Sequence, residues 1–187
     1  MTAPSAIHIV GISGSLRERS YNSAALKAAG ELLPEGVTLE RVGIGDLPLY
    51  NDDLRLQGYP PSVQHLRERL AAADGVLLVT PEYNYSVPGV LKNAIDWASR
   101  PPDQPFNGKP VAIMGASPGM LGSARAQYHL RQMLVFLNAY ALNRPEVMIA
   151  QAASKFDDAG TLIDAPTREF LKTFLAAFAD WIRRMRS

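Results

Sequence analysis

Hydrophobic residues in this chain fall into short continuous runs that alternate with longer amphipathic stretches. The short runs, which are typical of buried β-strands, cover residues 6–12, 37–42, 75–80, 109–117 and 146–150. The amphipathic stretches repeat their apolar residues at helical spacing and predict helices at residues 22–33, 62–73, 88–99, 123–139 and 166–185. We expect Ser62 to cap the second of these helices.

The alternation of strands and helices indicates a parallel sheet with right-handed crossovers and helices on both faces. Five strands suit the flavodoxin-like order 2-1-3-4-5 better than a six-stranded dinucleotide-binding fold. We therefore expect an α/β, flavodoxin-like three-layer sandwich with a five-stranded parallel sheet, formed by a single domain over residues 1–187. The irregular connection at residues 43–61 is long for a compact domain, and such connections are often functional.

Composition narrows the classes of function. The chain carries a formal net charge of +1 and no run of lysine and arginine, which argues against nucleic acid as a partner. It has no cysteine, so disulfides, thiolate nucleophiles and iron–sulfur clusters are excluded, and redox chemistry would need a bound organic cofactor. No signal-peptide pattern and no apolar run of the ~18–20 residues of a membrane span are present. We expect a cytoplasmic protein that does not associate with membranes.

The segment between the first strand and the first helix, Gly11–Asn22, has the composition of a phosphate-binding loop. Its serines and Asn22 offer hydroxyl and amide donors, Arg17 offers a charged fork, and the next helix points its N-terminal amides at the same place. The segment matches neither the dinucleotide fingerprint nor the nucleoside-triphosphate loop, which ends in GK[ST]. A single serine here could simply cap the helix, but the whole cluster favours a phosphate site.

Two further loops, at residues 81–86 and 117–122, follow the third and fourth predicted strands and should converge on the same crevice. The first can present Tyr83 and Asn84 to the edge of a ring. The second is nearly free of side chains, so its backbone can approach a flat face. A phosphate loop beside a ring-binding loop suggests a flavin nucleotide. For Glu82, the alternative is a partner for the N-terminal dipole of a helix.

Together these residues resemble the NADPH-dependent FMN reductases, the flavodoxin-like group that includes quinone, azo-dye and chromate reductases. The resemblance rests on residues 14–22 and 80–97, and the order of strands and helices matches over nearly the full length. It implies that FMN is bound by Ser15, Leu16, Arg17, Ser20 and Asn22 at the phosphate, by Pro81, Glu82, Tyr83 and Asn84 along the isoalloxazine ring, and by Ser117 and Gly119 near its other edge. It also implies a homodimer or homotetramer, with polar contacts between subunits from Arg125, Tyr128 and Glu146.

The family's activity implies hydride transfer from NADPH or NADH, through FMN, to quinones, azo compounds, metal oxyanions such as chromate, or free flavin. The cofactor would carry the chemistry, so we expect no catalytic side chain and no metal, and we interpret His8, His65 and His129 as structural. The alternatives are a flavodoxin-type electron carrier, commonly a more acidic protein, and a protein that kept the fold without the cofactor. A preference for NADPH rests on the family alone, with Arg100 the one candidate for contacting its 2′-phosphate.

Overall fold

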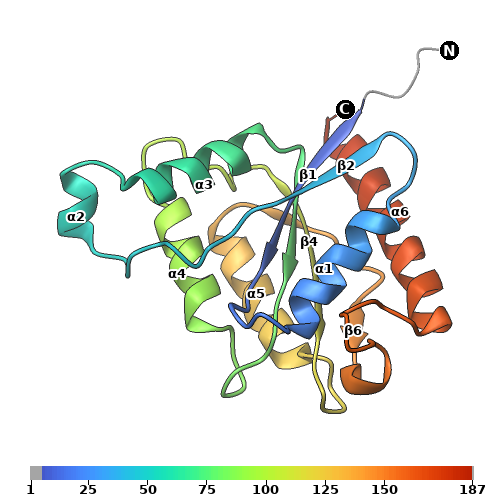
Figure 1. Ribbon diagram of the computed structural model, residues 1–187. Helices are drawn as coiled ribbons and strands as arrows, with labels where there is room; N and C mark the ends of the chain where they lie inside the picture. Colours follow the sequence, from blue (N-terminus) through green and yellow to red (C-terminus); the bar gives the residue numbers. More distant parts are fainter. Residues whose placement is uncertain (1–5, 187) are drawn as a thin grey trace, which may run out of the picture.

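The computed structural model describes residues 6–186, which form a parallel β-sheet between two layers of helices (Figure 1). The strands are β1 (Ile7–Ser13), β2 (Val37–Arg41), β3 (Gly75–Val79), β4 (Pro110–Ala116), β5 (Tyr140–Ala141) and β6 (Val147–Ile149). Their order is β2-β1-β3-β4-β5, with β6 also paired to β4, and all of these pairings are parallel. The predicted strand order is confirmed.

Helices cover both faces of this sheet. They are α1 (Tyr21–Glu31), α2 (Asp52–Leu56), α3 (Pro61–Ala72), α4 (Gly89–Ala98), α5 (Ala124–Phe136), the 3₁₀ turn η1 (Ala152–Ser154) and α6 (Ala165–Arg186). In Figure 1, α1 and α6 lie on one side of the strands, and α3, α4 and α5 lie on the other. The three predicted layers are therefore present.

The two faces of the strands supply two hydrophobic cores. In β1, Ile7 and Ile9 belong to the core beneath α1 and α6, whereas Val10 and Ile12 belong to the core beneath α3, α4 and α5. All four side chains are at most 2% exposed. Burial on both faces explains why the strands read as continuous apolar runs rather than as alternating patterns.

Three local features differ from the expectations. The predicted strand at 146–150 is preceded by a second short strand, because the edge beyond β4 is interrupted by a segment containing Pro145, which has no N–H to donate. The expected cap at Ser62 is wrong: α3 begins at Pro61, and the Ser62 hydroxyl donates instead to the carbonyl of Asp46 at 3.3 Å. The irregular connection at 43–61 contains the short helix α2.

A buried guanidinium holds the corner where α3 meets the end of α4. Arg67 is 8% exposed and donates to the carbonyl oxygens of Ala98, Arg100 and Pro102 at 2.6, 2.8 and 2.5 Å. Its guanidinium also lies 4.3 Å from the centre of the Tyr59 ring. Buried charges need such partners, and here carbonyl dipoles and an aromatic face supply them.

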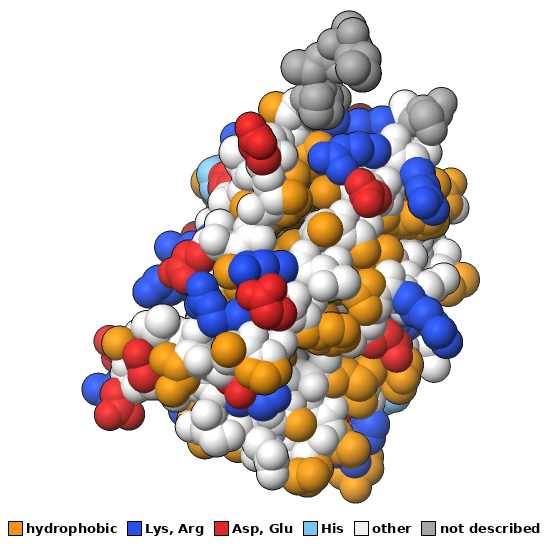
Figure 2. Space-filling view, turned by 90° about the vertical axis from the view of Figure 1, so that its right-hand side faces the viewer, with side chains coloured by type: hydrophobic (Ala, Val, Ile, Leu, Met, Phe, Trp, Pro, Cys, Tyr) orange, Lys and Arg blue, Asp and Glu red, His pale blue; other side chains and the backbone are white. Residues whose placement is uncertain are grey.

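The surface carries charges of both signs. On the face seen in Figure 2, Lys and Arg side chains alternate with Asp and Glu and with apolar groups, without a broad field of one sign. Across residues 6–186, none of the helices has both the length and the apolar character needed to cross a lipid bilayer.

Candidate functional site

The loops that follow β1, β3 and β4 begin next to one another at the carboxyl edge of the sheet. The Gly14 N–H donates to the Val79 carbonyl at 2.8 Å, which ties the first loop to the end of β3. The Thr80 N–H donates to the Met114 carbonyl at 2.9 Å, which ties the second loop to β4. This edge is where α/β sheets bind ligands, so the predicted convergence of the three loops is confirmed at their starting points.

Ser20 caps α1 and still has a donor to offer. Its side-chain oxygen accepts the N–H groups of Asn22 and Ser23 at 3.2 and 3.3 Å, which satisfies two first-turn amides. The hydroxyl hydrogen takes no part in these bonds. Ser15 is in a similar position, because its oxygen accepts the Arg17 N–H at 3.4 Å. Ser15 and Ser20 are buried, with 8% and 5% of their surface exposed. Both hydroxyl hydrogens can be donated to a phosphate oxygen.

The backbone between these serines provides further donors. Within the described residues, the N–H groups of Leu16, Glu18 and Arg19 donate to no protein acceptor. Free amides gathered just before the start of a helix can form an anion-binding concavity. The Leu16 side chain is 55% exposed and packs against Gly45, so only its backbone can face a phosphate.

The motif implies that Asn22 contacts a phosphate, but its side chain contacts the backbone at the end of β4. Its side chain is 4% exposed, accepts the Ala116 N–H at 2.9 Å and donates to the Ala116 carbonyl at 3.0 Å. The amide thereby pairs with the backbone at the end of β4, as a neighbouring strand would. A single amide hydrogen is left for any phosphate, and the main role of Asn22 is to hold α1 against β4.

The loop after β3 ends in a tight hairpin. Tyr83 and Ser86 exchange backbone hydrogen bonds of 3.1 and 2.9 Å, and the two residues between them, Asn84 and Tyr85, have φ of 49° and 65°. Two consecutive positive φ angles define a type I′ turn, in which a bulky residue such as Tyr85 is strained. The Ser86 hydroxyl lies 2.9 Å from His129 Nδ1 on α5, which anchors the hairpin. Tyr83 and Asn84 are exposed beyond the sheet edge.

The carboxylate of Glu82 is turned away from the crevice. Its side chain is 9% exposed and accepts the Arg125 and Ala126 N–H groups at 3.0 and 3.4 Å. It also pairs with the Arg125 guanidinium, which in turn lies 3.5 Å from the centre of the Tyr85 ring. The expectation that Glu82 lines a ring therefore holds at most for its backbone. The alternative of a helix-dipole partner is the better interpretation, with α5 as the helix.

The loop after β4 is only partly free of side chains. The Ser117 hydroxyl accepts the Gly119 N–H at 3.0 Å, and the carbonyls of these two residues accept the N–H groups of Ala152 and Gln151, each at 3.0 Å. The expectation fails for the rest of the loop, because Met120 and Leu121 are 73% and 49% exposed. Residues 117–119 thus form a braced stretch of backbone, followed by an apolar tip.

Arg125, Tyr128 and Glu146 all have contacts within the chain. Besides the Glu82–Arg125 pair, the Tyr128 hydroxyl lies 3.4 Å from a Glu146 carboxylate oxygen. His8 and His129 bond to Glu40 and Ser86, and His65 is exposed on α3. No cluster of three or more histidine, aspartate or glutamate side chains suited to a metal occurs between residues 6 and 186.

The donors present fit a flavin mononucleotide. A phosphate dianion needs several donors and a nearby cation, and the first loop supplies two buried hydroxyls, three free amides and the exposed Arg17. A flat ring needs an aromatic or apolar wall and adjacent backbone, which the hairpin and residues 117–119 supply. Sequence reasoning found these loops but not the bracing residues Gln151 and Ala152, which carry no motif.

Comparisons with known proteins agree with the assignment of these loops to a flavin mononucleotide. Residues 7–154 match the family model described as NADPH-dependent FMN reductase. An NAD(P)H-dependent FMN reductase of Pseudomonas aeruginosa is 58% identical over 180 residues, which cover 96% of this chain and 97% of that protein. A quinone reductase of Escherichia coli is 46% identical over 183 residues, covering 96% and 97%. The solved structure of FerB, a flavoenzyme NAD(P)H:(acceptor) oxidoreductase from Paracoccus denitrificans, superposes with a TM-score of 0.88 at 41% identity and covers 96% of this chain and 98% of that one.

Proposed function

The chain belongs to the NADPH-dependent FMN reductase family, and from this premise we propose that it is an FMN-dependent oxidoreductase that transfers hydride from NAD(P)H to small-molecule acceptors. Quinones are the first acceptors to consider, because quinone reductases are 46% identical to the chain over nearly its whole length. Azo compounds, chromate and free flavin are further candidates. The observation that carries the proposal is the loop of free donors after β1, placed beside the hairpin after β3.

We assign the FMN phosphate to the first loop. Ser15 and Ser20 would donate their hydroxyl hydrogens, the amides of Leu16, Glu18 and Arg19 would donate from the backbone, and Arg17 would add its charge. Arg17 forms no ion pair within the described residues, so its guanidinium is available. Charge-assisted hydrogen bonds of this kind are stronger than neutral ones.

We assign the ring to the hairpin and to the braced backbone after β4. Pro81, Tyr83 and Asn84 would border one side, and Ser117 with Gly119 would border the other. Bound FMN supplies the hydride-accepting chemistry. The chain's own side chains bind and orient, since the carboxylate nearest the hairpin, Glu82, is engaged with α5. Loss of any one side chain should therefore weaken binding without abolishing hydride transfer.

Substitution of Arg17 tests the phosphate assignment. The variant Arg17→Ala should bind FMN more weakly by about 1.5–3 kcal/mol, the contribution of a charge-assisted hydrogen bond. Flavin fluorescence during titration of the apoprotein measures this affinity. Arg183→Ala, a change at an exposed pair on α6, is the matched control. Equal FMN affinity in the two variants would remove Arg17 from the site.

A flavodoxin-type electron carrier is the alternative, and a simple measurement separates the two. A reductase should lose its flavin absorbance when NADPH or NADH is added anaerobically with no partner enzyme present. A carrier would keep its oxidised spectrum until a separate reductase was supplied. The nearly balanced charge, +1 overall, is unlike that of acidic carriers.

We further propose that the protein acts in the cytoplasm, where NAD(P)H is abundant, and that it forms a homodimer or homotetramer. The support for association is an apolar stretch at the end of α5, where Val135 and Phe136 are 81% and 84% exposed. Side chains of this kind are seldom left in water side by side on a monomer.

A further inference from the structure

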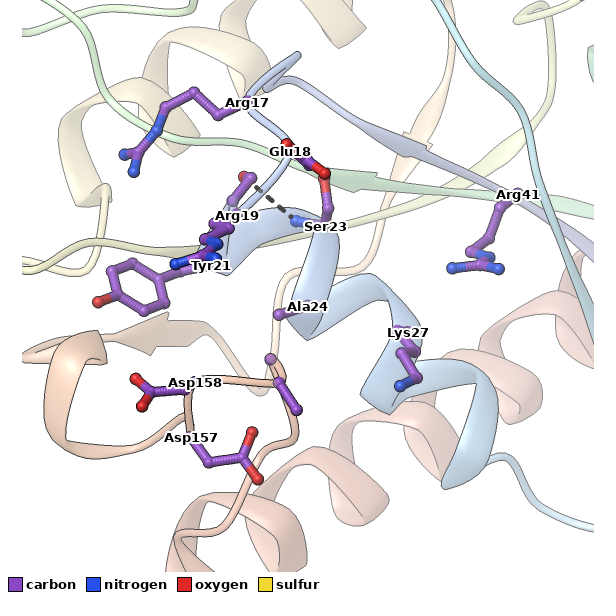
Figure 3. Close-up of a pocket in the computed structure, with 13 residues that line it drawn as sticks. Arg17, Glu18, Arg19, Tyr21, Ser23, Ala24, Lys27, Arg41, Asp157 and Asp158 are labelled. Carbon is purple, nitrogen blue, oxygen red and sulfur yellow. Dashed lines mark hydrogen bonds between the residues drawn. The ribbon is translucent and has the colours of Figure 1, made fainter.

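A hollow of about 450 Å³ adjoins the phosphate loop and includes Arg17 and Ser20 in its lining (Figure 3). It is bounded by the end of that loop, by the outer face of α1, by the end of β2 and by residues 157–160. Its charged lining residues are Arg17, Glu18, Arg19, Lys27, Arg41, Asp157 and Asp158. None of the loops assigned to the flavin ring takes part in it.

Of the four cations that line this hollow, Arg17 is assigned to the FMN phosphate, which leaves Arg19, Lys27 and Arg41 for a second ligand. In the part of the chain that the structure describes, the side chains of Arg17, Arg19, Lys27 and Arg41 donate to no acceptor and form no ion pair. Arg67, in contrast, donates to three backbone carbonyls. Several free cations around one concave site are the arrangement that binds phosphate groups.

The remaining lining suits the rest of a nucleotide. Asp157 and Asp158 offer carboxylate acceptors for ribose hydroxyls or an exocyclic amine, although one Asp157 oxygen already accepts the Thr161 N–H at 2.7 Å. Tyr21 offers an aromatic ring, which is held 5.7 Å from the ring of Phe156. Cations, acceptors and an aromatic surface together match a phosphorylated nucleoside better than a simple inorganic anion.

Lys27 and Arg41 lie in a different part of the hollow from Asp158. Arg41 and Ser23 also line a neighbouring hollow of about 420 Å³ beside residues 42–45, whereas neither aspartate reaches it. Figure 3 shows Lys27 and Arg41 toward the right of the view, and Asp158 toward the left on the same side as Arg19. A phosphate near Lys27 and Arg41 would therefore lie away from Asp158.

The hollow is connected to the flavin site through residues 151–157. Gln151 and Ala152 brace the backbone at 117–119, and Asp157 lies five residues further along. Five residues span at most about 18 Å even when fully extended. An extended dinucleotide can bridge the distance from the braced backbone to the part of the hollow lined by Asp157.

We propose that this hollow binds the adenosine 2′-phosphate half of NADPH, with Lys27 and Arg41 contacting the 2′-phosphate. The inference rests on the proposed function and adds the site that distinguishes NADPH from NADH. It replaces Arg100, the candidate suggested by sequence. The Arg100 guanidinium donates to Ser99, lies 5.4 Å from the centre of the Tyr50 ring and does not line the hollow.

Calorimetry on the FMN-loaded protein tests the site directly. Adenosine 2′,5′-bisphosphate should bind at least about 10-fold more tightly than adenosine 5′-monophosphate, as expected for one charge-assisted hydrogen bond. This preference should disappear in Lys27→Gln/Arg41→Gln and persist in the control Lys172→Gln, which changes a cation on α6. The single variant Lys27→Gln provides a milder change should the double variant not fold. Equal affinity of the wild type for the two nucleotides would overturn the proposal.

Kinetics separate this inference from the proposed function. In Lys27→Gln/Arg41→Gln, KM for NADPH should rise by at least about 10-fold, while KM for NADH and the FMN content stay unchanged. If both nucleotides reduce the flavin but neither KM changes, the hollow is not the 2′-phosphate site. If neither nucleotide reduces the flavin of the wild type, the proposed function itself fails.

Discussion

Asn22 joins the first helix to the fourth strand by two hydrogen bonds in a buried environment. The contact crosses 94 positions of sequence and fixes where α1, and hence the phosphate loop, lies relative to β4. A residue of the phosphate motif is thus chiefly a support for the loop. The same holds for Ser20, whose oxygen caps α1 while its hydrogen remains free.

Removal of the Asn22 side chain should therefore destabilise the fold. In Asn22→Ala, the buried N–H and carbonyl of Ala116 lose their partner, at about 1–3 kcal/mol for each group. We expect the free energy of unfolding in urea to fall by about 2–4 kcal/mol. Gln132→Ala, on the exposed face of α5, is the control. An unchanged urea midpoint together with a large loss of FMN affinity would show that Asn22 acts mainly by contacting the phosphate.

The residue types of the site could be predicted from sequence, but their partners could not. Ser15, Arg17 and Ser20 lie in the loop between β1 and α1, as expected, because this loop is local in sequence. Asn22 and Glu82 bond to residues 94 and 43 positions away, and no local pattern encodes such pairings. The hollow lined by Lys27 and Arg41 was missed for the same reason, since its walls come from three distant segments.

At the scale of elements, the hairpin after β3 and the helix α5 form one unit. Glu82 caps α5, Arg125 of α5 covers the ring of Tyr85, and Ser86 bonds to His129. The strained turn at Asn84 and Tyr85 is thereby held from the helix side. Strain of this kind persists only where the surroundings enforce it, and it concentrates at binding sites.

Glu82→Ala should loosen this unit. We expect a loss of about 1–3 kcal/mol in the free energy of unfolding, because a buried cap and its ion pair are removed together. Flavin affinity should fall in parallel, since the hairpin is released. Denaturation and FMN titration measure the two effects. Glu169→Ala, at an exposed pair on α6, should change stability by less than about 0.5 kcal/mol. A stable variant with normal hydrogen exchange in the hairpin would contradict the coupling.

The kinds of element followed from the hydrophobic pattern, whereas their ends did not. Strands buried on both faces and helices with one apolar face produce distinct periodicities, and both were identified. The start of α3 and the split of the last strand depend on Pro61 and on the segment around Pro145. There, local backbone chemistry overrides the apolar pattern.

At the scale of the whole molecule, Phe136 is the best single test of association. The variant Phe136→Glu places a charge in the exposed apolar stretch at the end of α5 and should shift the protein toward monomer in light scattering. Leu56→Glu is the matched control, because Leu56 is also exposed, at 71%, but lies on α2. An unchanged mass in Phe136→Glu would exclude this stretch from an interface.

Asp74 makes the stability of the molecule depend on pH. It accepts the His8 N–H at 2.7 Å and pairs with Arg186, so it links β1 to the end of α6. Burial alone would raise the pKa of Asp74, but the His8 N–H and the Arg186 guanidinium outweigh it and hold the pKa below its ordinary value. A lowered folded-state pKa stabilises the protein above the unfolded value of about 3.9. That stabilisation is lost as the pH falls through the folded pKa.

Asp74→Asn should therefore be less stable than the wild type at pH 6, and the two should converge as the pH falls below about 4. Urea midpoints measured between pH 6 and 3 give the comparison. Asp46→Asn, at an exposed carboxylate, should follow the wild-type curve. A constant difference between Asp74→Asn and wild type across this range would show that the link does not titrate.

The contacts of Arg67, unlike those of Asp74, do not depend on pH. Its three hydrogen-bond acceptors are backbone carbonyls and its fourth neighbour is an aromatic ring, so none of them takes up a proton in acid. A guanidinium itself stays charged throughout. Acidification thus weakens the attachment of α6 to β1 and spares the corner between α3 and α4. In acid, the molecule should therefore begin to lose its structure at the C-terminal helix α6, while the contact between α3 and the end of α4 persists.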